Sequence, residues 1–165
     1  MNSHLQLIQN KIVTLTEAVS LSLEWKKNGD VVFTNGCFDI LHSGHLHYLS
    51  SAADLGNKLI IGLNSDNSIA NLKGKNRPFI KESDRLLMLA SLAFVDAVVL
   101  FEQDTPIQLI ESISPDILVK GGDYTEENIV GHQIVKKNGG KVISLQFLEG
   151  YSTTNFIEKI KHGKN

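Results

Sequence analysis

The alternation of short apolar segments with helical segments constrains the fold of this chain most. Strand-like runs occur at residues 31–33, 58–63, 97–101, 117–119 and 142–145. Their continuous hydrophobicity is typical of strands that are buried on both faces of a parallel sheet. The sequence therefore predicts an α/β fold, a Rossmann-like parallel sheet with helices on both faces. Ligands of such folds bind beyond the carboxyl ends of the strands.

Helices are expected between these strands. Their ranges are 16–27, 43–55, 64–72, 85–95, 126–137 and 152–161, and one more follows the capping sequence Asp104-Thr105-Pro106. Proline early in a helix and hydroxyl or carboxylate residues just before it are typical start signals. Asn28-Gly29 ends the first helix.

The length of 165 residues fits one compact domain. We expect a single domain over residues 1–165, with a helical N-terminal extension at 1–28 and a catalytic core at 30–161. A net charge of -2 gives no general reason to expect nucleic acid as a partner. No apolar run approaches the roughly 20 residues that span a bilayer, and Cys37 is a single cysteine. We expect a cytoplasmic protein with no membrane partner.

Two histidines follow the first strand in the sequence Asn35-Gly36-Cys37-Phe38-Asp39-Ile40-Leu41-His42-Ser43-Gly44-His45. At the start of a helix, His42 and His45 lie on one face, and Gly44 leaves the backbone open to close approach. Free amides at the helix N-terminus and imidazole donors suit an oligophosphate. An isolated H-x-x-H is more often a surface or metal-binding pair, but its place directly after the first strand favours the phosphate interpretation.

The common nucleotide fingerprints are absent from the sequence. Gly140-Lys141 is followed by Val142, which excludes the P-loop pattern, and no G-x-G-x-x-G follows the first strand. The sequence therefore disfavours a P-loop kinase and an ordinary dinucleotide dehydrogenase.

Three further clusters are candidates for phosphate or substrate binding. They are Lys73-Gly74 with Arg77 and Arg85, then Lys120-Gly121-Gly122-Asp123-Tyr124, and finally Ser152-Thr153-Thr154. Charge-assisted contacts, close backbone approach and a helix N-terminus are all means of holding phosphates. The alternatives are a solvated basic loop, a glycine turn and a helix cap. For Arg85, an ion pair at a helix start competes equally with a phosphate role.

The signature Thr34-Asn35-Gly36-Cys37-Phe38-Asp39 with His42-Ser43-Gly44-His45 resembles that of the cytidylyltransferase-like superfamily. Its members join nucleoside triphosphates to phosphorylated acceptors. The resemblance implies that His42 and His45 stabilise the α-phosphate while the acceptor phosphate attacks in line. It also implies that Lys73 contacts the triphosphate, that Mg²⁺ assists, and that no covalent enzyme intermediate forms.

A longer series of blocks, from about residue 31 to 160, resembles the adenylyltransferases of ADP-heptose synthesis. Besides the signature, it includes Asn64-Ser65-Asp66, Asp104-Thr105-Pro106, the Lys120 block and Gly150-Tyr151-Ser152-Thr153-Thr154. The resemblance implies ATP and D-glycero-β-D-manno-heptose 1-phosphate as substrates, the free-standing form of the enzyme, and a homo-oligomer, expected to be a dimer.

These patterns and resemblances assign His42, His45 and Lys73 to catalysis. They assign nucleotide binding to Thr34, Asn35, Gly36, Cys37, Phe38, His42, Gly44, His45, Lys120, Gly121, Ser152, Thr153 and Thr154. They assign substrate binding to Asp39, Asn64, Asp66, Arg77, Arg85, Gly122, Asp123 and Tyr124. No residue is assigned as a protein ligand of a metal, and Mg²⁺ is expected to bind with the ATP phosphates.

Three alternatives remain open from the sequence. A glycerol-phosphate cytidylyltransferase would keep the chemistry, but those enzymes carry an arginine shortly before E-G-x-S-T-T, where this chain has Phe147-Leu148. Lys120 or Arg85 is a candidate substitute for that arginine. A non-catalytic nucleotide sensor is a second alternative, although the intact histidine pair argues against it. Cys37 as a nucleophile is a third, disfavoured because its neighbours supply no base beyond the histidines.

Overall fold

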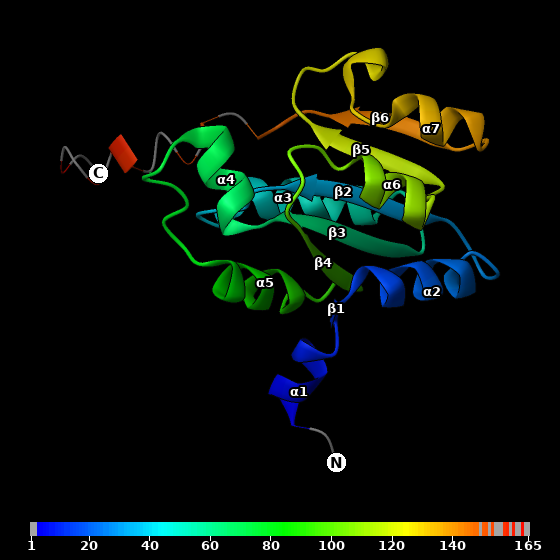
Figure 1. Ribbon diagram of the computed structural model, residues 1–165, viewed down its shortest axis with the longest axis horizontal. Coiled ribbons are helices and arrows are strands. Elements are labelled where there is room, and N and C mark those ends of the chain that lie inside the picture. Colours follow the sequence, from blue (N-terminus) through cyan, green and yellow to red (C-terminus); the bar gives the residue numbers. More distant parts are fainter. Residues whose placement is uncertain are drawn as a thin grey trace.

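One sheet of six parallel strands forms the centre of the molecule (Figure 1). The computed structural model describes residues 3–148, 150, 151, 153, 157, 158, 160 and 163. The strands are β1 (Ile12–Val13), β2 (Val31–Gly36), β3 (Lys58–Asn64), β4 (Ala97–Phe101), β5 (Ile117–Gly121) and β6 (Lys141–Leu145). The predicted Rossmann-like α/β fold is confirmed.

The chain adds strands to one side of β2 first and then to the other side. The order across the sheet is β1-β4-β3-β2-β5-β6, and every pair is parallel. From β2 the chain moves outward through β3 to β4, then returns to place β5 on the other side of β2. The carboxyl ends of β2 and β5 therefore form a topological switch point, where open α/β sheets bind their ligands.

Helices connect the strands and cover both faces of the sheet. They are α1 (His4–Gln9), α2 (Leu15–Trp25), α3 (Ser43–Ala53), α4 (Asp66–Lys73), α5 (Glu82–Ala90), α6 (Ile107–Ile113), the 3-10 helix η1 (Glu126–Asn128) and α7 (His132–Lys137). Figure 1 shows α6 in front of the sheet and α3 behind it. Within the part of the chain that the structure describes, no helix is both long and apolar enough to cross a membrane.

The core consists of two apolar layers, one on each face of the sheet. Successive side chains of a strand point to opposite faces. Accordingly, Val31 and Phe33 pack in the layer under α2, α6 and α7, whereas Val32 packs in the layer under α3 and α5. All three side chains are completely buried. This packing on both faces explains why the strands are continuously hydrophobic.

Several boundaries differ from the sequence prediction for local reasons. The helix expected over 126–137 is interrupted by Gly131, whose φ of 91° breaks it into η1 and α7. Pro106 itself occupies the N-cap of α6, and no side-chain cap hydrogen bond forms there, so the predicted cap by Asp104 and Thr105 is wrong. Helix α5 starts at Glu82 and ends at Ala90, earlier than expected.

Two short elements at the start of the chain were not predicted. Helix α1 has six residues and β1 has two, too few for a periodic pattern. Strand β1 extends the sheet by pairing Ile12 with Val98 of β4. Of the helix expected over 152–161, the described residues Thr153, Ile157, Glu158 and Ile160 are helical, and the others lie outside the described residues.

Candidate active site

A cavity of about 450 Å³ lies at the carboxyl ends of the central strands. Most of the residues that the sequence assigned to binding or catalysis line it. They are Asn35, Gly36, Cys37, Phe38, Asp39, His45, Asn64, Lys73, Lys120, Gly121, Tyr124 and Thr153. Residues from the ends of β2, β3 and β5 thus meet at the switch point.

The two histidines stack at the start of α3. Their ring centroids lie 3.8 Å apart with an interplanar angle of 20°. His42 is the N-cap, and its Nδ1 accepts a hydrogen bond from the backbone amide of His45 at 3.4 Å. Because Nδ1 is the acceptor, the proton of neutral His42 resides on Nε2, which is thereby a donor. His45 lines the cavity, whereas His42 lies behind it with 9% of its surface exposed.

Both histidines are held in the neutral form. Burial, with smaller contributions from the charges of His42 and Lys73, lowers the pKa of His45 to about 4. Burial also lowers the pKa of His42. Neutral imidazoles still donate hydrogen bonds, so the pair can bind phosphate oxygens without first carrying charge.

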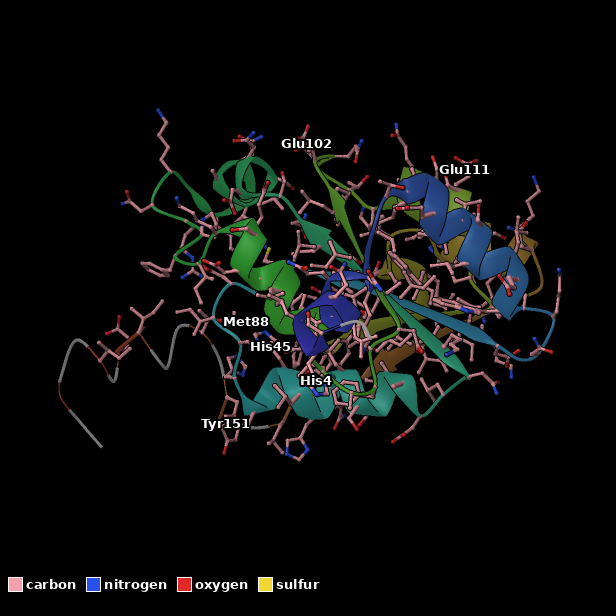
Figure 2. All side chains as sticks on the ribbon, turned by 90° about the horizontal axis from the view of Figure 1, so that it is seen from below. His4, His45, Met88, Glu102, Glu111 and Tyr151 are labelled. Carbon is pink, nitrogen blue, oxygen red and sulfur yellow. The ribbon has the colours of Figure 1, made fainter. Side chains whose placement is uncertain are left out.

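Phe38 and Tyr151 enclose the histidine pair. Phe38 adopts a positive φ of 44° and presents its ring to His45 in a T-shaped contact at 5.3 Å. His45 and Tyr151 lie at the same end of α3 in Figure 2. A Cβ at Gly44 would meet the Cβ of Tyr151 at 2.7 Å, so this position requires glycine. The close approach predicted at Gly44 is therefore made by Tyr151 and the His42 ring.

Two lysines line the cavity, and they come from chain segments on either side of β2. Lys73 ends α4, which follows β3, whereas Lys120 belongs to β5, and β2 lies between β3 and β5. Lys120 Nζ donates to the carbonyl oxygen and to Oδ1 of Asn35, at 3.3 and 3.4 Å. Burial lowers the pKa of Lys120. The cavity thus has an ammonium group on each side of the strand that leads to the histidines.

Tyr48 of α3 ties the switch point together. Its hydroxyl lies 2.5 Å from Thr34 Oγ1 of β2 and donates to the carbonyl oxygen of Val119 in β5 at 3.3 Å. Burial raises the pKa of Tyr48 to about 12. Thr34 is completely buried and does not line the cavity. In the structure it positions α3 against the two strands.

Asp39 anchors the loop that follows α4. Its Oδ1 accepts hydrogen bonds from the backbone amides of Phe79 and Ile80 at 2.7 and 3.0 Å. Its Oδ2 forms an ion pair with Arg77 Nε at 3.0 Å. The Arg77 guanidinium also lies over the Phe79 ring at 4.6 Å. Asp39 and Arg77 therefore hold the loop over the end of β2.

Arg85 is completely buried and uses its guanidinium within the protein. Nε donates to Ile80 O, Nη1 to the carbonyl oxygens of Cys37 and Asn64, and Nη2 to Asp66 Oδ1 at 2.7 Å. These acceptors come from the signature loop, the end of β3, the start of α4 and the loop before α5. Of the two candidates for the missing arginine, Lys120 lines the cavity and Arg85 does not.

Other assigned residues lie outside the cavity wall. Asp66 pairs with Arg85, Asp123 is exposed, and Gly122 donates its amide to Leu145 O at 2.9 Å. Ser152 and Thr154 lie outside the described residues. The roles assigned to these residues remain predictions.

Several lining residues were not assigned from the sequence. Tyr48, Leu72, Val130 and Phe147 line the cavity, as do Asp104, Thr105 and Pro106. Phe147 packs so closely that a Cβ at Gly121 would lie 2.5 Å from its ring. The sequence offered only a glycine at the end of β5 and an aromatic residue after β6. That the two residues touch and line the cavity together is visible only in the tertiary structure.

The residues that line the cavity fit a metal ion that arrives with phosphates. Among the described residues, no group of three or more His, Cys, Asp or Glu could hold a metal ion by itself. Asp39 Oδ2 is buried and lacks a hydrogen bond, although it lies beside Arg77. One carboxylate combined with substrate phosphates and water is a common environment for Mg²⁺.

A family model described as cytidylyltransferase-like matches residues 33–159. This match covers most of the chain and includes strands β3 to β6, most of β2, the histidine pair and both lysines. The chain belongs to the cytidylyltransferase-like family of nucleotidyltransferases.

Bacterial relatives are similar over nearly the whole chain. The bifunctional protein HldE of Magnetococcus marinus is 50% identical over 156 residues, which are 94% of this chain and 32% of the relative. The bifunctional protein HldE of Helicobacter hepaticus is 52% identical over 159 residues, 96% of this chain and 32% of the relative. The chain spans about a third of the length of these relatives.

Two solved structures share the fold. The lipopolysaccharide core biosynthesis protein from Thermoplasma volcanium has a TM-score of 0.59 and 26% identity, covering 76% of this chain and 100% of the other. The pantoate-beta-alanine ligase from Francisella tularensis has the same TM-score at 14% identity, covering 92% of this chain and 78% of the other. At that identity, the second likeness concerns the fold alone.

Replacing Arg85 tests whether its role is structural. Arg85→Lys keeps the charge but cannot satisfy all four acceptors. We expect the free energy of unfolding in urea to fall by about 2 kcal/mol or more, because buried acceptors lose their donors. Lys136→Ala, which removes an exposed ion pair with Glu126, is the control and should cost less than about 1 kcal/mol. Unchanged stability with weakened ATP binding would identify Arg85 as a phosphate ligand instead.

The buried, neutral state of His45 predicts a specific pH dependence of stability. Because its folded pKa of about 4 lies below the ordinary histidine value of 6.5, the unfolded chain binds more protons between these two pH values. The contribution of neutral His45 to the free energy of unfolding is therefore fully present above about pH 6.5. It is lost progressively as the pH decreases toward 4. Urea unfolding at pH 7, 6 and 5 should show a smaller decrease for His45→Gln than for the unsubstituted chain. Equal slopes for the two proteins would contradict the assignment.

Proposed function

We propose that this chain transfers AMP from ATP to D-glycero-β-D-manno-heptose 1-phosphate, giving ADP-heptose and pyrophosphate for the lipopolysaccharide core. The observation that carries the proposal is the meeting of His45, Lys73 and Lys120 in one cavity at the switch point. The choice of substrates is supported by the block order, which resembles the adenylyltransferases of ADP-heptose synthesis. It is also supported by the sequence identity of 50% and 52% to the two HldE relatives, and by the similarity to a lipopolysaccharide core biosynthesis protein.

The reaction is a single in-line displacement at the α-phosphorus. An oxygen of the acceptor phosphate forms the new bond to phosphorus, and the bond between this phosphorus and the α,β-bridging oxygen breaks. Pyrophosphate leaves with the electron pair of that bond. A phosphate monoester is a nucleophile at neutral pH, so no side chain has to remove a proton. Positioning and charge stabilisation are the main contributions of the protein.

The arrangement of donors suits this displacement. An in-line reaction places the attacking and leaving groups on opposite sides of the phosphorus, and the two lysines of the cavity wall come from chain segments on opposite sides of β2. We assign Lys73 to the leaving pyrophosphate and Lys120 to the acceptor phosphate. His45, with the amides at the start of α3, donates to the α-phosphate oxygens between them. His42 Nε2 adds a further donor to that phosphate.

Mg²⁺ is proposed to bind with the ATP phosphates, where it would neutralise charge that develops on pyrophosphate. Asp39 is a carboxylate of the cavity wall that could contact such an ion, and its buried Oδ2 is at present paired only with Arg77 Nε at 3.0 Å. Binding there would require Arg77 to shift from Asp39, which leaves its guanidinium available for a phosphate. Asp39 thereby couples the loop after α4 to the triphosphate.

The remaining assignments follow from the same geometry. Ser152, Thr153 and Thr154 are proposed to bind the nucleotide, and Thr153 lines the cavity. We also propose that the reaction takes place in the cytoplasm, where ATP is available, and that the active protein is a homodimer.

A pyrophosphate-release assay over ATP or CTP with heptose 1-phosphate or glycerol 3-phosphate tests the proposal. We expect turnover only with ATP and heptose 1-phosphate. His42→Ala and His45→Ala should each lower kcat by about 100-fold or more, because each removes a preorganised donor. His4→Ala, on exposed α1, is the matched control and should retain full activity. Preference for CTP and glycerol 3-phosphate, or normal turnover by the double histidine variant, would refute the proposal.

A further inference from the structure

Helix α1 projects beyond the sheet at its β1 edge (Figure 1). All six of its residues are exposed or half-buried, and Leu5 and Leu7 are 52% and 51% exposed. Ile8 packs against the apolar layer under α3 and α5. A helix of this length is much shorter than the roughly 12 residues at which an isolated helix becomes marginally stable in water. Burial of the two leucines against a further surface would therefore stabilise α1.

A shallow hollow of about 320 Å³ lies on the α2 side of the same edge. The described residues that line it come from β1 and α2, and they are Val13, Thr16, Glu17, Ser20 and Leu21. Glu17 is the one charged residue among them, and its carboxylate accepts hydrogen bonds from the backbone amide and the hydroxyl of Thr14, both at 2.8 Å. The hollow is thus a mainly aliphatic recess whose charge already has partners.

The projecting helix and the hollow lie on opposite faces of the sheet edge. Val13 and Leu21 pack on the layer under α2, α6 and α7, whereas Ile8 packs on the other layer. Among the described residues, the wall of the hollow includes none from α1. Each chain thus presents an apolar projection and a separate apolar recess at one edge. Two copies can cover both features at once, because a two-fold axis makes every contact occur twice.

We propose that two copies of this chain associate at the β1 edge, and that α1 of each copy inserts Leu5 and Leu7 into the α2 hollow of the other. The inference rests on the proposed homodimer and names its interface, but it is independent of the reaction and of the acceptor. Charge favours a second copy as the occupant. Helix α1 carries no Asp, Glu, Lys or Arg, so Glu17 meets no like charge. Depletion of charged residues is typical of the core of an interface.

The mass of the protein in solution, measured by light scattering after size-exclusion chromatography, tests this interface. We expect the unsubstituted chain to be a dimer at micromolar concentration. Leu5→Asp/Leu7→Asp and, separately, Ser20→Arg should each raise the Kd of the dimer about 30-fold or more, as loss of interface hot spots does. All three positions are exposed, so both variants should fold. Ile107→Asp, at a 42% exposed position at the start of α6, is the matched control and should leave the Kd unchanged.

An equimolar mixture of the two variants distinguishes this arrangement from direct packing of α1 on α1. A mixed dimer keeps one intact contact, between α1 of the Ser20→Arg chain and the hollow of the Leu5→Asp/Leu7→Asp chain. A dimer of either variant alone keeps none. We therefore expect dimers in the mixture at concentrations where each variant alone is monomeric. A mixture that contains only monomers would contradict the insertion of α1 into the hollow.

Two further outcomes would overturn the interface. A dimer that persists unchanged in both variants is held together by another surface, and an unsubstituted chain that is monomeric has no such interface. Turnover is measured separately. A monomer that releases pyrophosphate from the proposed substrates would leave the proposed reaction standing, whereas an inactive dimer that both variants dissociate would refute the reaction and support the interface.

Discussion

The position of β2 between β3 and β5 is the constraint on which the rest of the structure depends. All three strands are parallel, so their carboxyl ends meet at one edge and their following segments diverge there. The signature loop leaves from β2, while Lys73 arrives by way of β3 and Lys120 by way of β5. This topology brings Lys73, Lys120 and His45 to one cavity, where they are available to the phosphates of the proposed in-line transfer.

Buried polar contacts then fix the parts of this junction relative to one another. Arg85 joins the signature loop to the end of β3 and the start of α4. Tyr48 joins α3 to β2 and β5, and Asp39 joins the signature loop to the loop after α4. Buried polar groups are costly when they lose a partner, so these contacts favour one arrangement of the loops. They hold the loop that carries the histidines in place, while burial keeps both imidazoles neutral.

The sequence predicted the fold and the reaction class because both depend on local patterns. Continuous apolar strands predicted the parallel sheet, and H-x-G-H with its flanking signature indicated the nucleotidyltransferase class through its resemblance to the family. Such local patterns could not predict contacts between segments that are far apart in the sequence. The D-R pair near the start of α5 left two roles open for Arg85, and only burial against four acceptors separates them. Phe147 was read as the place of a missing arginine, whereas in the structure it packs on Gly121 and Tyr48. The break at Gly131 likewise depends on its positive φ.

In the proposed mechanism, the acceptor phosphate attacks the α-phosphorus directly, between Lys73 and Lys120, with no covalent enzyme intermediate. The stereochemical course at that phosphorus tests this most directly. ATP with a sulfur atom on the α-phosphorus, supplied as one diastereomer, would be turned over and the configuration of the nucleotide-sugar product determined. A single in-line displacement predicts inversion. Retention would contradict the account, because it requires a second displacement through a nucleophile of the protein, such as Cys37 or one of the histidines.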